Sequence, residues 1–146
     1  MIAVTVTPDA FDVGVETTRL SVAGVGAVAN FVGIVRADDT LIALTLEHYP
    51  GMTEAALAAL AHEARDRWSL SAATIHHRVG RLVPGDAIVF VGTAAAHRRD
   101  ALDACAFLID RLKTDAPFWK RESFADGRQR WGEPRASDDA ATARWR

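Results

Sequence analysis

Hydrophobic positions follow two different periods along the chain. Apolar residues recur every three or four positions over 53–68 and over 98–113, which predicts two amphipathic helices. Segments that alternate in polarity, or that are continuously apolar, predict strands at 2–6, 26–36, 41–49, 73–79 and 87–94. Asp12 is a candidate N-cap of a short helix that continues to about Leu20. Two further strands, at 118–124 and 129–133, flank Asp126-Gly127, a dipeptide typical of a hairpin turn.

The order of these elements predicts one α/β (α+β) domain over residues 1–146. Asp38-Asp39 is a turn signal between the second and third strands, so we expect these strands to pair as a hairpin. Gly33, inside the second strand, predicts a bulge or a close approach of another backbone. The predicted architecture is a mixed sheet with two main helices and an added C-terminal hairpin. Residues 134–146 read as a polar tail in which Trp145 is a candidate for packing against the domain.

Composition and charge exclude several classes of protein. Hydrophobic residues make up 49% of the chain and charged residues 25%, as in an ordinary globular protein. Seventeen basic against nineteen acidic residues give a net charge of −2, which argues against a protein that coats nucleic acid but leaves local basic clusters open. We expect neither a membrane span nor a signal peptide, because no apolar run is long enough and no basic segment precedes the first one. A cytoplasmic protein is therefore the expectation.

The basic residues are unevenly divided between arginine and lysine. Fifteen are arginines, and the two lysines, Lys113 and Lys120, lie seven positions apart in the segment LKTDAPFWKRE. Biased codon usage with two surviving lysines is one explanation. The other explanation is a catalytic role for the two lysines, because an ammonium group can release its proton whereas a guanidinium group does not. Pro117 ends the preceding helix, and the resulting turn can bring both amines towards one pocket.

The second predicted helix begins with clustered cations and no polar cap. His97, Arg98 and Arg99 occupy its first turn in AAAHRRDALDA, where the helix dipole already disfavours positive charge. Exposed helix amides beside cations suit a phosphate or a carboxylate. The alternative is a solvated surface on which Asp100 and Asp103 neutralise the arginines. Arg36, where the second strand runs out, is a third candidate for holding an anion.

Other catalytic chemistries find little support in the sequence. The five histidines show no HxxxH or HExxH spacing, and the adjacent His76 and His77 point to opposite faces of a strand, so we expect no metal site. Cys105 lies on the core-facing stripe of a helix and cannot form an intrachain disulfide. Neither a glycine-rich phosphate loop nor a GxSxG nucleophile motif is present, and no resident cofactor is expected.

Several segments together resemble the catalytic large subunit of molybdopterin synthase. They are FVGIVR at 31–36, LTLEHYPGM at 44–52, RVGRLVPGDAIVFVGTAAAHR at 78–98, LKTDAPFWKRE at 112–122 and RWGEPRASD at 130–138. The resemblance runs in the same order over nearly the whole chain, and LKTxAPFWKRE with an upstream AHR is its most specific part. The loop after Arg36, ADDT, is shorter than the glycine-containing loop common in that family.

The resemblance implies a fold, a reaction and a set of site residues. The fold is an α/β hammerhead with additional strands, and the reaction converts cyclic pyranopterin monophosphate to molybdopterin by placing two sulfurs on adjacent carbons, forming a dithiolene. The implied catalytic residues are Lys113 and Lys120. The residues implied to hold the anionic substrate are Arg36, His97 and Arg98, and those implied to line the pocket are Ile34, Val35, Arg121 and Glu122.

The same resemblance implies protein partners. Sulfur would arrive as a thiocarboxylate on the C-terminal Gly-Gly of a small ubiquitin-like carrier subunit. The catalytic subunit would form a homodimer with one carrier at each end, a heterotetramer, in which His97 and Arg98 reach the pocket of the neighbouring copy. Two other functions stay open at this point. One is a non-enzymatic phosphate or nucleotide sensor, and the other is a structural partner that has lost activity.

Overall fold

The strands of the protein form two sheets. The structure, a computed structural model, describes residues 1–38, 40–132 and 136–145. The strand order in sheet A is β1 (Ile2–Thr7), β4 (Ala72–Arg78), β6 (Ala87–Ala95) and β2 (Ala27–Ile34). The order in sheet B is β5 (Gly80–Leu82), β3 (Leu41–His48), β7 (Phe118–Phe124) and β8 (Gln129–Gly132). Sheet A is mixed, because β1 and β4 run parallel and its other pairs run antiparallel. The α+β class is confirmed, with the strands divided between two sheets.

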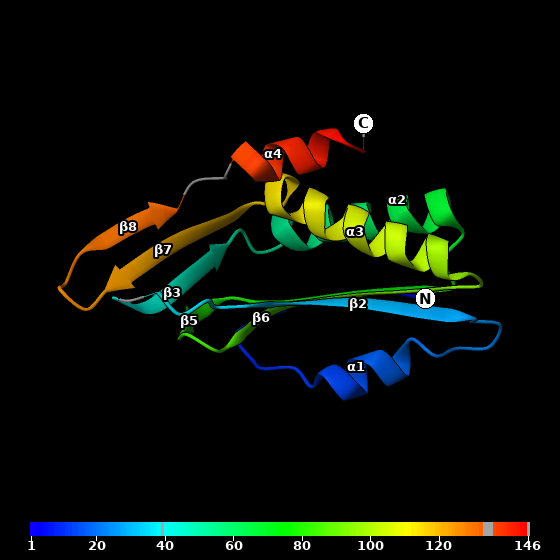
Figure 1. Ribbon diagram of the computed structural model, residues 1–146, viewed down its shortest axis with the longest axis horizontal. Coiled ribbons are helices and arrows are strands. Elements are labelled where there is room, and N and C mark those ends of the chain that lie inside the picture. Colours follow the sequence, from blue (N-terminus) through cyan, green and yellow to red (C-terminus); the bar gives the residue numbers. More distant parts are fainter. Residues whose placement is uncertain (39, 133–135, 146) are drawn as a thin grey trace.

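The two main helices lie on one face of sheet A. They are α2 (Met52–Trp68) and α3 (Arg98–Asp115), and the shorter α1 (Val13–Arg19) lies on the opposite face (Figure 1). Each of the three predicted helices is confirmed to within two residues at its ends. Asp12 caps α1 as expected, since its carboxylate accepts a hydrogen bond from the Val15 amide at 2.9 Å. Within the described residues, no helix is both long and apolar enough to cross a membrane.

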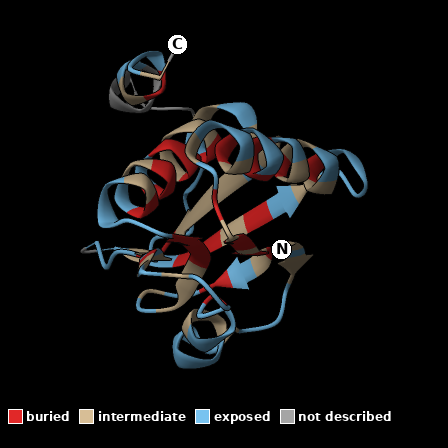
Figure 2. Ribbon diagram, turned by 90° about the vertical axis from the view of Figure 1, so that its right-hand side faces the viewer, coloured by how far each residue is buried: buried red, intermediate tan, exposed pale blue. Residues whose placement is uncertain are grey.

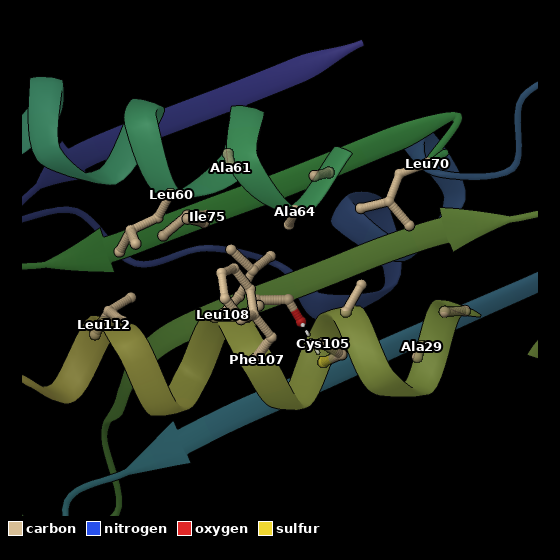
Figure 3. Close-up of a cluster of buried hydrophobic side chains, with 14 of the residues drawn as sticks. Ala29, Leu60, Ala61, Ala64, Leu70, Ile75, Cys105, Phe107, Leu108 and Leu112 are labelled. Carbon is tan, nitrogen blue, oxygen red and sulfur yellow. Dashed lines mark hydrogen bonds between the residues drawn. The ribbon is translucent and has the colours of Figure 1, made fainter. Parts of the chain in front are cut away.

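The core lies between sheet A and the inner faces of α2 and α3. Figure 2 shows the buried residues concentrated in this layer, while the outer surfaces of the helices are exposed. Phe107 and Leu108 of α3 project towards Leu60 of α2 and Ile75 of β4 (Figure 3). The Cys105 thiol is buried in the same layer and contacts the carbonyl oxygen of Val91 at 3.7 Å. The three- and four-residue apolar spacing of both helices therefore marks the surface that they bury.

The expected hairpin of the second and third strands is wrong. β2 pairs over its whole length with β6, whereas β3 pairs with β5 and β7 in the other sheet. After β2 the Val35 amide donates to the carbonyl of Asp86, and the Gly85 amide donates to the carbonyl of Val35, both at 2.8 Å. These bonds to the turn at 83–86 direct the chain out of sheet A. Of the predicted Asp38-Asp39 turn, Asp39 lies outside the described residues.

Two glycine predictions are confirmed. Gly127 has a φ of 88°, a conformation that suits glycine, in the turn of the β7–β8 hairpin. At Gly33 the register of β2 against β6 shifts, and an added Cβ would lie 2.9 Å from Cγ1 of Val89. β2 therefore has the expected irregularity at Gly33, and the close approach comes from the Val89 side chain, not from another backbone; both lie directly before the residues expected to enter the site.

The C-terminal segment contains a helix that the sequence did not predict. α4 (Ala136–Ala143) lies beside α3 (Figure 1), and Trp145 packs edge to face on Trp68 and Phe107 with ring centroids 5.7 and 5.8 Å apart. The Trp145 Nε1 donates to Oδ2 of Asp110 at 2.6 Å. Trp145 thus packs against the domain, as the sequence suggested, and its contacts hold the C-terminal segment against α3.

Replacing this anchor should destabilise the protein. Trp145→Ala removes the aromatic contacts and leaves Asp110 without its indole donor, so the free energy of unfolding should fall by about 2–4 kcal/mol. Arg144→Ala is the matched control, because this neighbour is largely exposed and makes only a 3.5 Å ion pair. Chemical denaturation measures both variants. Equal, small losses in the two would show that the C-terminal segment is not anchored by Trp145.

Candidate active site

A cavity of about 500 Å³ lies where the two sheets meet. Its walls come from the end of β2, from β4 and β6 of sheet A, from β3, β7 and β8 of sheet B, and from the C-terminal end of α3. The apolar lining residues are Ile34, Val35, Leu41, Leu44, Leu46, Ile88, Leu112, Ala116 and Phe118. The polar and charged lining residues are Arg36, Asp38, His77, Lys113, Lys120, Glu122 and Arg130. An apolar wall with a few convergent charged groups, at this volume, suits a small-molecule ligand.

Strand alternation decides which residues of β7 face the cavity. Lys120 and Glu122 pair in register with Leu46 and Leu44 of β3, and all four line the cavity. Arg121 lies between them, so its side chain points to the other face of sheet B. There its guanidinium lies 5.9 Å from the ring centroid of Trp131. The expectation that Arg121 lines the pocket is therefore not met in the cavity of this chain.

The turn between α3 and β7 brings the two lysines to the same cavity. Ala116 leaves the helical conformation with a ψ of 131°, as expected for a residue before proline, and Lys113 lies in the last turn of α3. The hydroxyl of Thr53, which is fully buried, donates to the carbonyl of Pro117 at 3.0 Å and accepts from the Tyr49 amide at 3.0 Å. Thr53 thus ties the start of α2 to the turn that separates Lys113 from Lys120.

The cavity carries a net positive charge. Arg36, Lys113, Lys120 and Arg130 contribute four cations against the two carboxylates of Asp38 and Glu122. Arg130 binds Glu122 through one nitrogen, which lies 3.0 and 3.2 Å from the two carboxylate oxygens. The excess of cations over carboxylates, in a partly enclosed space, favours an anionic ligand such as a phosphate ester.

Six of the nine predicted site residues meet in this cavity, and His97 and Arg98 do not. Both lie at the start of α3, and at 1.5 Å per residue the fifteen residues from Arg98 to Lys113 span about 22 Å. The start of the helix is uncapped by a side chain, as the sequence predicted, because His97 is the N-cap and makes no side-chain capping bond. Arg99 forms a 3.9 Å ion pair with Asp103. Within one chain, the cations at the start of α3 are therefore separate from the cations of the cavity.

Sequence reasoning missed three charged or titratable residues of the cavity. Arg130 lies in the RWGEPRASD segment, but only its pairing with Glu122 across β7 and β8 shows that it faces inward. Asp38 was assigned only to a turn. The alternation of His76 and His77 is confirmed, since the His76 ring contacts Phe11 while His77 lines the cavity. The alternation alone did not indicate which of the two would face the site.

His77 is held in one orientation and kept neutral. Its ring stacks on Phe118 with centroids 3.9 Å apart, and its Nδ1 lies 2.8 Å from the carbonyl oxygen of Arg78. Burial lowers the pKa of His77 to about 4, and the positive charges of Lys113, His48 and His76 act in the same direction against the Arg78 carbonyl. At neutral pH the cavity therefore contains a neutral imidazole.

This burial predicts a loss of stability in mild acid. The pKa of His77 is lower in the folded state than in the unfolded chain, so as the pH falls the unfolded chain takes up the proton first. Above pH 6.5 His77 is neutral in both states, and its titration does not lower the free energy of unfolding. As the pH falls from 6.5 to 4, the free energy of unfolding drops by a total of about 3 kcal/mol.

The measurement is the free energy of unfolding by urea across this pH range, for the parent protein and for His77→Phe, which does not titrate there. We expect the variant to lose about 3 kcal/mol less than the parent between pH 6.5 and pH 4. His76→Phe is the control on the opposite face of β4. Parallel curves for the parent protein and His77→Phe would contradict a buried neutral histidine.

Cys105 is not a candidate nucleophile. Burial raises the pKa of its thiol to about 11, so almost no thiolate exists at neutral pH. Its side chain lies in the core between α3 and sheet A, away from the lining of the cavity. Cys105 therefore supplies no nucleophile to the cavity.

The comparisons with known proteins agree with one another. The model of the MoaE protein family matches residues 6–115. The chain is 53% identical to the molybdopterin synthase catalytic subunit of Pseudomonas aeruginosa, covering 98% of both chains. It is 52% identical to that of Escherichia coli, covering 97% of both chains.

Solved structures show the same fold. A molybdopterin cofactor biosynthesis protein E from Burkholderia multivorans superposes with a TM-score of 0.86 at 52% identity, covering 99% of this chain and 97% of that one. More distantly, subunits 1 and 2 of a molybdopterin-converting factor from Helicobacter pylori were solved as a complex. One chain of it matches at a TM-score of 0.75 and 21% identity, covering 92% of this chain and 91% of that one.

The fold and the cation-rich cavity define a protein with a binding site for a small anionic molecule. The chain belongs to the MoaE protein family, whose relatives here are molybdopterin synthase catalytic subunits, and it is accordingly a sulfurtransferase of molybdenum cofactor biosynthesis.

Proposed function

We propose that the cavity binds cyclic pyranopterin monophosphate and that Lys113 and Lys120 move protons while sulfur is transferred to it. The observation that carries the proposal is the position of the two lysines of the chain, which line one cavity from different elements. The Lys113 amine enters from the end of α3 and the Lys120 amine from β7. Placing sulfur on carbon with loss of water needs a proton donor and a proton acceptor, and two amines in one site supply both.

The phosphate of the substrate is bound by the cations at the rim. Arg36 follows β2 and is exposed at the mouth of the cavity, while Arg130 approaches from β8. Guanidinium groups form two parallel hydrogen bonds to a phosphate, so they orient it as well as attract it. Ile34 and Val35 form an apolar wall behind Arg36, and Glu122 keeps Arg130 in place through their ion pair. The pterin ring would lie against the apolar lining of the cavity.

The sulfur donor is the C-terminal thiocarboxylate of a small ubiquitin-like carrier subunit. Its Gly-Gly tail would enter extended, because glycine has no Cβ and can pass close to the walls. The thiocarboxylate is an anion, which the net positive charge of the cavity attracts. The two-subunit complex named for the Helicobacter pylori relative supports such a partner.

His97 and Arg98 would complete the cavity of a second copy of the chain. In one chain they lie about 22 Å from Lys113 along α3, too far to touch the same substrate. Both are exposed, and the uncapped amides beside them form a further site for negative charge. We therefore propose a homodimer, and with two carriers a heterotetramer. A cytoplasmic location stays a prediction.

Charge-conserving replacement of the lysines tests the proposed chemistry. In a reaction that contains the thiocarboxylated carrier and the pterin precursor, Lys113→Arg and Lys120→Arg should each lower the rate of dithiolene formation by on the order of 10²–10⁴, because arginine keeps the charge but does not exchange the proton. Both variants should unfold at the temperature of the parent protein. Arg65→Lys, a half-buried position on α2 that does not line the cavity, is the control for the reverse change, from arginine to lysine.

Parental rates in both lysine variants would contradict the proposal. They would favour instead the phosphate sensor, in which the lysines serve only as cations. A sensor would also bind the precursor with the same affinity whether or not a carrier is present, which calorimetry can measure.

Subunit complementation tests the shared site. Lys113→Ala and Arg98→Ala are each expected to be nearly inactive, but a mixed dimer purified through two different tags has one intact cavity. It should recover about half of the parental activity, as for two independent sites related by a twofold axis. The control is a mixed dimer of one Lys113→Ala chain and one Lys120→Ala chain. Each change disables the cavity of its own chain, so neither cavity is intact. Equal activity in the two mixed dimers would contradict the proposed contribution of Arg98.

A further inference from the structure

His77 is a buried titratable residue of the cavity that the proposed reaction does not use. Its side chain is 3% exposed, and it lines the cavity from β4, the second strand of sheet A. Burying a polar side chain costs stability unless its polar atoms are hydrogen-bonded, and an apolar side chain would avoid this cost. An apolar residue at this position would continue the apolar stripe of Ala73 and Ile75, which pack in the core on the same face of β4.

The contacts of His77 fix which nitrogen carries its proton. A carbonyl oxygen can only accept, so the 2.8 Å contact with the Arg78 carbonyl makes Nδ1 the donor and leaves Nε2 with a free lone pair. The stacking on Phe118, at 3.9 Å and an interplanar angle of 19°, prevents the ring from turning without loss of this contact. The ring of His77 is therefore oriented by the hydrogen bond from Nδ1 to the Arg78 carbonyl and by its stacking on Phe118.

The surroundings of the His77 ring favour a neutral imidazole, which can accept a hydrogen bond, over a protonated one. The cationic and titratable groups that act on the ring are Lys113 of α3, His48 of β3 and the adjacent His76. All of them disfavour a positive charge on the imidazole. Of these, Lys113 is the one that also lines the cavity. A lysine amine sits on four rotatable bonds, and it needs a fixed acceptor if it is to point in one direction.

We propose that His77 is a positioning residue for sulfur transfer, with its Nε2 accepting a hydrogen bond from the amine of Lys113 and holding that amine towards the substrate. The inference rests on the proposed function of Lys113. His77 does not touch the reacting atoms in this account. It acts on the reaction through the orientation of the amine.

Two replacements of His77 separate positioning from packing. His77→Phe keeps a flat ring against Phe118 but offers no acceptor, so kcat should fall about 10- to 100-fold, as for a catalytic group displaced by about 1 Å. His77→Gln retains both a donor for the Arg78 carbonyl and an acceptor for the amine, and it should recover most of this loss. The KM values for the precursor and the carrier should stay within about twofold, since no substrate contact is removed.

The neighbouring histidine is the matched control. His76 lies on the same strand but on its other face, where its ring contacts Phe11 at 5.0 Å and its Nε2 is buried without a hydrogen-bond partner among the described residues. His76→Phe should leave kcat unchanged. A direct readout of the amine is its rate of acetylation, measured by mass spectrometry of the peptide that contains Lys113. This rate should change in His77→Phe and not in His76→Phe.

Several results would overturn the inference. They are an equal loss of kcat in His77→Phe and His77→Gln, an effect on KM alone, or an unchanged acetylation rate of Lys113 in His77→Phe. If His77→Phe does not fold, His77→Leu is measured in its place and judged in the same way. A strong loss in Lys113→Arg with normal kcat in His77→Phe refutes only this inference. Parental rates in Lys113→Arg instead refute the proposed role of Lys113, on which this inference rests.

Discussion

The turn at Pro117 is the constraint on which the site depends. It connects α3, which packs on sheet A, with β7, which belongs to sheet B, and so it forces the chain across the junction of the two sheets. The hydrogen bond from the buried Thr53 hydroxyl fixes the carbonyl of Pro117 from the start of α2. Because Lys113 precedes this turn and Lys120 follows it, one local crossing places both amines in the same cavity.

Local patterns predicted the elements of the fold but not their partners. The helices α2 and α3 could be predicted because an apolar face repeats within each of them, and the β7–β8 hairpin because Asp126-Gly127 sets its turn. The partner of β2 could not, since the choice of β6 over β3 depends on an antiparallel match along eight residues far apart in sequence. The helix α4 was missed for a similar reason. Thr142 in it is 1% exposed and bonds to the Asp110 carbonyl of α3, a contact that no local period shows.

The candidate site was predictable where composition singled out a residue. The two lysines stood out because arginine provides every other basic side chain, and Arg36 because it follows a strand. Arg121 was misplaced because the resemblance covered a whole segment, whereas strand alternation divides that segment between two faces. His77 could not be recognised among five histidines. The role that we propose for it rests on its burial, on the stacking on Phe118 and on the charge of Lys113, all of which arise only after folding.

We propose that the pterin reacts in the cavity between the two sheets, with Lys113 and Lys120 on its walls. A crystal structure of the protein with bound cyclic pyranopterin monophosphate tests it most directly. We expect the phosphate to lie within hydrogen-bond distance of Arg36, and the carbons that receive sulfur to face the amines of Lys113 and Lys120. Electron density for the pterin outside this cavity, with both lysines remote from it, would show that the reaction takes place elsewhere.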